Sequence, residues 1–156
     1  MKTYNLLENS DFVKQIKKGS RLIGIDPGKR NVGIAICDPS HAVATPYETI
    51  QVQKLKNLIE RLDKIIIEND IKGIVVGHPI NMDGTEGPRS QSTKDFIKNI
   101  TKYINLPITL WDERLSSEGA FKSMQELGVN SSSKKDKLDK NSAAFILQGF
   151  IDYLKK

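Results

Sequence analysis

The sequence has a single cysteine, Cys37, among its 156 residues. One thiol excludes an internal disulfide framework and a cysteine-rich zinc site. The two histidines, His41 and His78, lack the spacing of a metal-binding pair, so we expect both to be structural or surface residues. No apolar run approaches the ~20 residues of a membrane span, and residues 1–20 lack the continuous apolar segment of a secretory signal. We therefore expect a cytoplasmic protein with no membrane partner.

Positive charge, in contrast, is in modest excess. The chain carries 24 Lys and Arg against 19 Asp and Glu, a formal net charge of +5. This excess favours a polyanionic partner such as nucleic acid, but only weakly, because many cytosolic domains carry as much. The lysines gather in the segment SSSKKDKLDK at 131–140, which is either a solvated loop or a binding patch.

Turn residues and hydrophobic periodicity predict one domain over residues 21–156, preceded over 1–20 by an N-terminal extension or a short helix that packs on the domain. The predicted strands are 21–26, 32–38, 42–50, 73–78 and 106–113. The predicted helices are 52–69, 89–103, 117–127 and 139–154, with a Ser- and Lys-rich loop before the last. The tight turn at 27–31 makes the first two strands an antiparallel hairpin.

This order predicts an α/β fold. A three-strand antiparallel meander followed by alternating helices and strands gives one mixed sheet with parallel strands, flanked by helices. The arrangement fits a ribonuclease H-like fold, and it also fits other α/β domains, so fold alone does not settle function.

Acidic residues fall at informative places in this scheme. Asp26 closes the first strand, and Asp112 and Glu113 end a later one. Because neighbouring residues in a strand point to opposite faces, only one of the latter two can share a site with Asp26 while the strand continues. Asp139 lies on the predicted core-facing stripe of the last helix. Converging buried carboxylates require a partner, and a hard divalent cation such as Mg²⁺ suits them.

Each acid also has a purely structural interpretation. Asp26 stands before Pro-Gly, where turn acids are common, and Asp139 could be the N-cap of its helix. Asp112 or Glu113 could pair with Arg114 or with a lysine.

Four stretches, in order, resemble the RuvX/YqgF family of ribonuclease H-like nucleases across about residues 21–154. They are IDPGKRNVGIAICD at 25–38, IVVGHPINMDGTEGPR at 74–89, LWDERLSS at 110–117 and DKNSAAFILQGFIDYL at 139–154. Two positions depart from the family pattern. Pro27 stands where many members have an aromatic, giving an IDPG similar to the opening of the RuvC resolvases, and Asn31 stands where members commonly have Arg.

The resemblance implies that Asp26, Glu113 and Asp139 form the catalytic and metal-binding set, holding one or two Mg²⁺ or Mn²⁺ ions. Glu113 is preferred to Asp112 on motif register alone. The basic residues expected to contact nucleic acid are Lys29, Arg30, Arg89, Arg114, Lys134, Lys135, Lys137 and Lys140.

The resemblance further implies one of two activities. One is nucleolytic processing of the 5′ end of pre-16S rRNA in ribosome biogenesis, with structured RNA as substrate. The other is cleavage of branched DNA as a Holliday junction resolvase, which calls for a homodimer rather than a monomer. A third hypothesis is a non-catalytic module that binds nucleic acid, a transcription factor or a ribosome-assembly partner.

Overall fold

The computed structural model describes residues 6–28, 30–79, 85–113 and 134–155, with the backbone alone at 88–89 and 134–140. Its elements in chain order are β1 (Leu6–Leu7), α1 (Asn9–Gln15), β2 (Arg21–Asp26), β3 (Asn31–Cys37), β4 (Ala44–Gln51), α2 (Leu55–Glu68), β5 (Ile71–His78), α3 (Pro88–Thr101), β6 (Ile108–Asp112) and α5 (Lys134–Leu154).

The strands form one mixed sheet in the order β1-β6-β5-β2-β3-β4. β2, β3 and β4 make the antiparallel meander, whereas β2, β5, β6 and β1 run parallel to one another. The predicted α/β mixed sheet is therefore confirmed. Its central strands are apolar on both faces, as expected when helices cover both sides.

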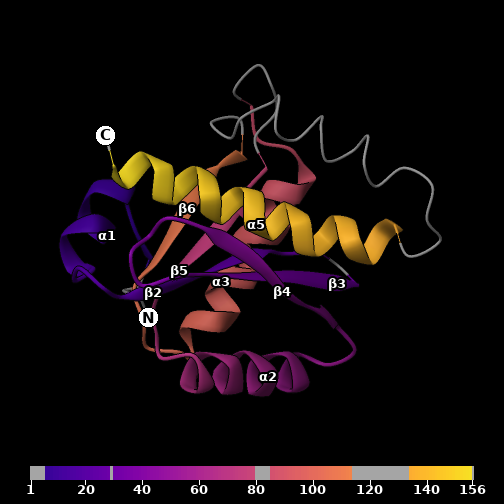
Figure 1. Ribbon diagram of the computed structural model, residues 1–156. Helices are drawn as coiled ribbons and strands as arrows, with labels where there is room; N and C mark the ends of the chain where they lie inside the picture. The colour runs from indigo at the N-terminus through magenta and orange to yellow at the C-terminus, as the bar shows by residue number, and fades with distance from the viewer. Residues whose placement is uncertain (1–5, 29, 80–84, 114–133, 156) are drawn as a thin grey trace.

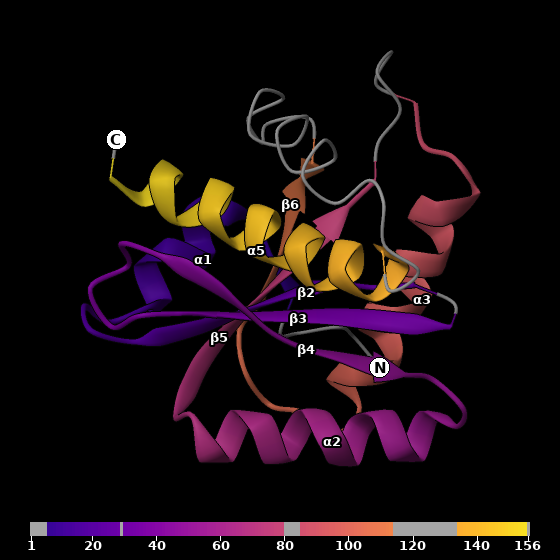
Figure 2. The same cartoon turned by 45° about the vertical axis from the view of Figure 1, so that its right-hand side comes forward.

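Helices cover the two faces unequally. α5 crosses one face, with α1 beside it, and α2 and α3 lie against the other (Figures 1 and 2). Strand alternation divides the core accordingly. Ile23, Ile25 and Val76 belong to an isoleucine-rich cluster with α2 and α3. Leu22 and Trp111 belong to a second cluster with α1 and α5.

The predicted strands and three of the predicted helices are present, with shifts of a few residues at their ends. β4 lies at the sheet edge, where its Pro46 removes no hydrogen bond that a further strand would need. The helix predicted at 117–127 lies outside the described residues.

The N-terminal segment is part of the sheet rather than an appendage to it. β1 pairs in parallel with β6, where Leu6 is level with Ile108. Phe12 of α1 is fully buried, and its ring meets that of Phe150 edge-on at 5.4 Å between centroids. A two-residue strand has no alternation that a sequence pattern could display.

The last helix begins earlier than expected. The predicted loop before residue 139 is wrong for residues 134–138, because α5 begins at Lys134. Lysine and leucine are good helix formers, and no glycine or proline interrupts this stretch, so the helix extends through the lysine cluster. Asp139 is therefore not an N-cap, since it lies in the second turn of the helix.

The single cysteine lies in the core. Cys37 is buried in β3, and burial raises the pKa of its thiol, as expected for an inert core residue. Within the described ranges, no helix combines the length and apolar character that crossing a bilayer requires.

Candidate active site

The carboxyl ends of β2, β5 and β6 meet at one edge of the sheet. Ile25 in β2 is level with Val76 in β5, so Asp26 extends to the level of Gly77. Gly77 is in turn level with Trp111 in β6, directly before Asp112 and Glu113. The acids that the sequence separates by more than 80 positions thus flank the end of one strand.

Strand alternation places Asp26 and Asp112 on opposite faces of the sheet. Leu22 is buried in the core cluster shared with α1 and α5. Asp26 follows it by four residues in the same strand, so it points to the same face, toward α5. Trp111 belongs to that cluster too, which turns the following residue, Asp112, toward α2 and α3. Glu113 follows the last residue of β6, so strand alternation no longer decides its side, and its contact with the α5 face of Gly77 does.

The glycine at the end of β5 fixes the place of Glu113. A Cβ added at Gly77 would lie 3.4 Å from Glu113 Oε2, so this carboxylate lies over the glycine on the α5 face. The structure therefore brings Asp26 and Glu113 to one face and one edge, on either side of Gly77. Asp112 is level with His78 and lies on the opposite face.

The two carboxylates have the chemical character of cation ligands. Asp26 and Glu113 are each half-buried, and the buried oxygens Asp26 Oδ1 and Glu113 Oε2 accept no hydrogen bond from the part of the chain that the structure describes, although both side chains make other interactions. Carboxylate oxygens so placed fit a hard divalent cation such as Mg²⁺. Within the described side chains no cluster of three or more candidate ligands occurs, and the side chain of Asp139 is outside that set.

α5 lies unusually close to the sheet, which positions the backbone of Asp139. A Cβ on Gly24 would come within 2.7 Å of Leu147 Cβ and 3.0 Å of the Ala143 carbonyl oxygen. Further along the helix, Gln148 binds the backbone of Ala42 and Ala44, at the end of the β3–β4 hairpin remote from Asp26. Moving toward its N-terminus, α5 therefore runs from that remote end past Gly24 toward Asp26.

Residue 139 follows this direction. It precedes Ala143 by one turn, on the same face of α5. Because Ala143 already lies over Gly24, the backbone of Asp139 lies one turn further toward the edge that carries Asp26. Other members of the predicted core-facing stripe are buried at Ala143, Ile146 and Phe150, whereas the prediction is wrong for Tyr153, which is exposed near the C-terminal end of the helix.

Of the predicted nucleic-acid contacts, Arg30 is the residue whose side chain is described. It is exposed in the turn after β2, and its carbonyl accepts a hydrogen bond from Val52 at 2.7 Å. Lys29 and Arg114 lie outside the described residues. For Arg89 in α3 and Lys134, Lys135, Lys137 and Lys140 in α5 the backbone alone is described.

A charged cluster that sequence patterns missed lies on the α3 side of the same edge. His78 Nε2 is 3.4 Å from Glu86 Oε1, and Lys94 Nζ donates to Glu86 Oε2 at 2.8 Å. The hydrogen bond from Lys94, with the charges of Lys94 and His78, lowers the pKa of Glu86. His78 thus has a structural partner, and no motif spacing marks Glu86, which precedes α3.

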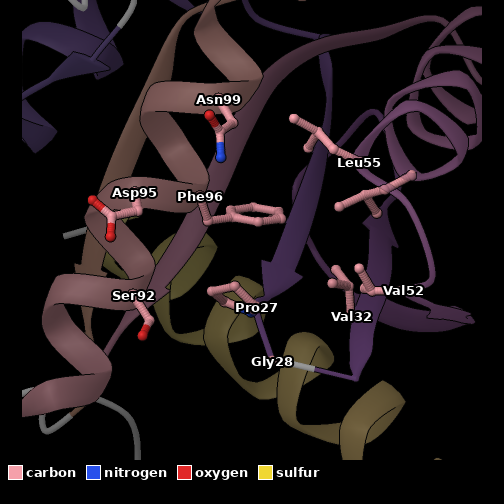
Figure 3. Close-up of a pocket in the computed structure, with 10 residues that line it drawn as sticks. Pro27, Gly28, Val32, Val52, Leu55, Ser92, Asp95, Phe96 and Asn99 are labelled. Carbon is pink, nitrogen blue, oxygen red and sulfur yellow. The ribbon is translucent and has the colours of Figure 1, made fainter.

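A pocket opens below the turn that follows Asp26. Its volume is about 320 Å³. Figure 3 shows the ring of Phe96 projecting from α3 into it, with Pro27 beside the ring and Leu55 and Val52 across from it. The remaining lining residues are Gly28, Val32, Leu58, Ser92, Asp95 and Asn99. In the sequence Phe96 is an apolar position of a predicted helix, and such a position carries no signal that separates a core residue from one that lines a pocket.

Comparison with known proteins identifies the chain's relatives. Residues 20–153 match the family described as RuvX: Holliday junction resolvase. A protein of Pelagibacter ubique named "Putative pre-16S rRNA nuclease" is 49% identical over 144 residues, covering 92% of this chain and 95% of the relative. A protein of the same name from Rhodobacter capsulatus is 41% identical over 144 residues, covering 92% and 91%.

Solved structures support the fold. RuvC of T. thermophilus in complex with a Holliday junction substrate aligns with a TM-score of 0.57 at 10% identity, covering 86% of this chain and 96% of that chain. The yeast mitochondrial Holliday junction resolvase Ydc2 aligns with a TM-score of 0.56 at 14% identity, covering 94% and 84%. At these identities the likeness concerns the fold alone, which is the ribonuclease H-like fold of the resolvases. The match over residues 20–153, with relatives at 49% and 41% identity, shows that this chain belongs to the RuvX family.

Proposed function

We propose that this protein is a divalent-metal-dependent nuclease of the cytoplasm that processes the 5′ end of pre-16S rRNA. The observation that carries the proposal is the meeting of Asp26 and Glu113 on one face of the sheet at one edge, beneath the helix that holds Asp139. Membership of the RuvX family and relatives named as pre-16S rRNA nucleases support the choice of reaction and substrate.

The three carboxylates would hold one or two Mg²⁺ or Mn²⁺ ions. Bound ions of this kind supply an activated water and stabilise the leaving oxygen of a phosphodiester. The protein's own part is to fix Asp26 and Glu113 on either side of a bare glycine and to bring α5 close enough for Asp139 to join them. Arg30, and the lysines of the first turns of α5, would bind the flanking phosphates, which makes affinity fall with salt.

A second candidate is cleavage of four-way DNA junctions. The description of the matching family as a Holliday junction resolvase favours it. Symmetric cutting of two strands requires a two-fold dimer, whereas trimming one RNA end does not. A monomer in solution would therefore count against the junction before any cleavage assay, whereas a dimer is compatible with both substrates.

The test is cleavage by the purified full chain of a pre-16S RNA precursor and of a four-way DNA junction, with Mn²⁺, Mg²⁺ or EDTA. We expect metal-dependent cleavage of the RNA, lost in Asp26→Asn, Glu113→Gln and Asp139→Asn. Asp152→Asn is the matched control, because Asp152 is an exposed acid of α5 hydrogen-bonded to Gln148.

Three results would contradict the proposal. Cleavage that persists in EDTA would contradict the metal-dependent mechanism. Cleavage of the junction alone would mean that the substrate is DNA. Intact cellular rRNA processing in cells carrying both Asp26→Asn and Glu113→Gln would leave a non-catalytic module that binds nucleic acid or a ribosome-assembly partner.

A further inference from the structure

The pocket beside the turn after Asp26 differs in character from the acidic edge itself. Its floor is apolar, made by Val32 and Leu58, which are buried, and by the partly exposed Leu55. Phe96 contributes a half-buried aromatic ring that projects into the space (Figure 3). At about 320 Å³ the pocket falls at the lower end of the range of small-ligand sites, roughly 300–1,000 Å³, which a single planar base can enter.

The polar groups of the pocket suit the edge of a base better than a phosphate. Ser92, Asp95 and Asn99 lie along one side of α3, at the rim. Ser92 and Asn99 offer a hydroxyl and an amide, groups that bind the ring nitrogens and amino groups of bases, whereas the Asp95 carboxylate is directed away from the Phe96 ring (Figure 3). The exposed Asp95 carboxylate accepts a hydrogen bond from Gln91 at 3.1 Å, and its negative charge would repel a phosphate in the same place.

The pocket and the proposed active site share the turn that follows β2. Pro27 and Gly28, which line it, directly follow Asp26 in the chain. The pocket and the carboxyl end of β2 therefore belong to the same edge of the sheet, one on the α3 side and the other on the α5 side. Exposed lysines stand next to lining residues in sequence, Lys54 before Leu55 and Lys98 before Asn99. They supply positive charge for a backbone that passes the rim.

The turn between the two sites is held in shape. A Cβ on Gly28 would come within 2.4 Å of the Asn31 carbonyl oxygen, so this position accepts no larger residue without a shift of the backbone. The Arg30 carbonyl is further tied to Val52, a lining residue, by a 2.7 Å hydrogen bond. A strand crossing the edge would thus meet a fixed distance between the carboxylates and the pocket.

We propose that this pocket binds one unpaired base of the substrate strand, stacked on Phe96 and read at its edge by Ser92 and Asn99. The inference rests on the proposed function in one respect, that the ligand is a nucleic acid strand. Stacking of an unpaired base on an aromatic ring is the usual way in which single-stranded RNA is held. The pocket would fix which phosphate reaches the acids.

The test measures binding and needs no cleavage. The full chain carrying Asp26→Asn is titrated in Mg²⁺ with single-stranded RNAs of about 12 nucleotides, a length in the usual range of ~4–16 for such sites. Each RNA lacks the base at one position. We expect one abasic position to lower affinity about 10-fold, the usual scale for losing one base–aromatic stack. In Phe96→Ala the intact RNA should bind about 10-fold more weakly, and no abasic position should lower affinity further.

Two further variants keep the result interpretable. Phe96→Leu fills the apolar space without an aromatic face, so it should also lose the abasic effect even if Phe96→Ala lowers the melting temperature. Tyr103→Ala removes an exposed aromatic just beyond α3, 63% exposed, and should leave every affinity unchanged.

The outcomes separate this inference from the proposed function. If the abasic effect depends on Phe96 but the parent protein, with Asp26 intact, cleaves no RNA, the pocket is sustained and the nuclease is overturned. Cleavage without such coupling, or no binding of the RNA at all, would overturn the pocket as a base site and favour an apolar peptide as its occupant.

Discussion

At the carboxyl edge of the sheet, the face under α5 and the face under α2 and α3 present different chemistry. The α5 face has bare glycines, Gly24 and Gly77, and two half-buried carboxylates, Asp26 and Glu113. The opposite face has isoleucine and valine side chains, a pocket, and acids paired with bases. One edge of the sheet thus offers carboxylates suited to cations on one face and an apolar pocket suited to an aromatic ring of a ligand on the other.

The spacing of the helices explains the contrast. Glycine lets α5 touch the strand backbone, which brings its residues within reach of the strand acids. On the other face, branched side chains such as Val32 of β3 and Leu58 of α2 lie between sheet and helices, and the space left beside them is the pocket. A substitution should therefore act differently according to the face it alters.

The largest effect is expected from Phe12→Ala. Phe12 is fully buried on the α5 face and meets Phe150 edge-on, so its loss should lower the free energy of unfolding by about 3–5 kcal/mol. Phe96→Ala makes the same chemical change on the pocket face, where the ring is half-buried, and should cost clearly less. Urea unfolding of both variants tests this, and equal losses would mean that the two faces do not differ in packing.

The next effect concerns the acids. Glu113→Gln should lower the rate of RNA cleavage by about 10²–10³-fold, the scale for losing one preorganised charged group of an active site. Asp112→Asn, one residue earlier but on the opposite face, should lower it far less. Melting temperatures should stay near that of the parent protein, because removing one of two neighbouring like charges relieves repulsion. A larger drop in cleavage rate for Asp112→Asn than for Glu113→Gln would mean that the reaction takes place on the face under α2 and α3.

The close approach of α5 gives the third prediction. Gly24→Ala should lower the free energy of unfolding by about 1–3 kcal/mol, because the new methyl group meets Leu147 Cβ and the backbone of Ala143. Gly77→Ala should cost less, since its nearest neighbour is Ile146 Cδ1, the end of a flexible side chain. Gly77→Ala places a methyl group 3.4 Å from Glu113 Oε2. It should therefore lower the cleavage rate more than Gly24→Ala does, although it lowers the free energy of unfolding less.

Thermal melts and cleavage rates of the two variants should therefore rank in opposite orders. If Gly24→Ala and Gly77→Ala ranked alike in both measurements, the distance between α5 and the sheet would not be what positions the acids.

Much of this fold could be predicted from the sequence, because its strands and helices carry strong local patterns. The run RLIGID with the following Pro-Gly turn predicts β2 and its hairpin, and α2 shows a clear helical period from Leu58 to Ile66. The site was predictable as a set of acids at strand ends, since parallel strands end at a shared edge.

The features that the sequence did not predict lack such a pattern. β2 and β5 are apolar on both faces, so no polarity in the sequence indicates which face α5 covers, and Asp112 and Glu113 could not be separated by alternation alone. β1 has two residues and exists because β6 offers it an edge. The pocket depends on the distance between α2 and α3, which no single segment encodes.

The smallest effect is expected from the charged cluster on the pocket face. Lys94 lowers the pKa of Glu86 by its hydrogen bond, so the pair stabilises the folded state above the ordinary glutamate pKa of about 4.3 and loses that contribution as the pH falls through the lowered pKa. Lys94→Ala should thus lower the melting temperature slightly at pH 7, and the difference from the parent should vanish in acid. Lys98→Ala removes an exposed charge from the same helix outside this pair and serves as the control. A difference that persisted in acid, where the Glu86 carboxyl is protonated, would mean that Lys94 stabilises the fold by something other than this pair.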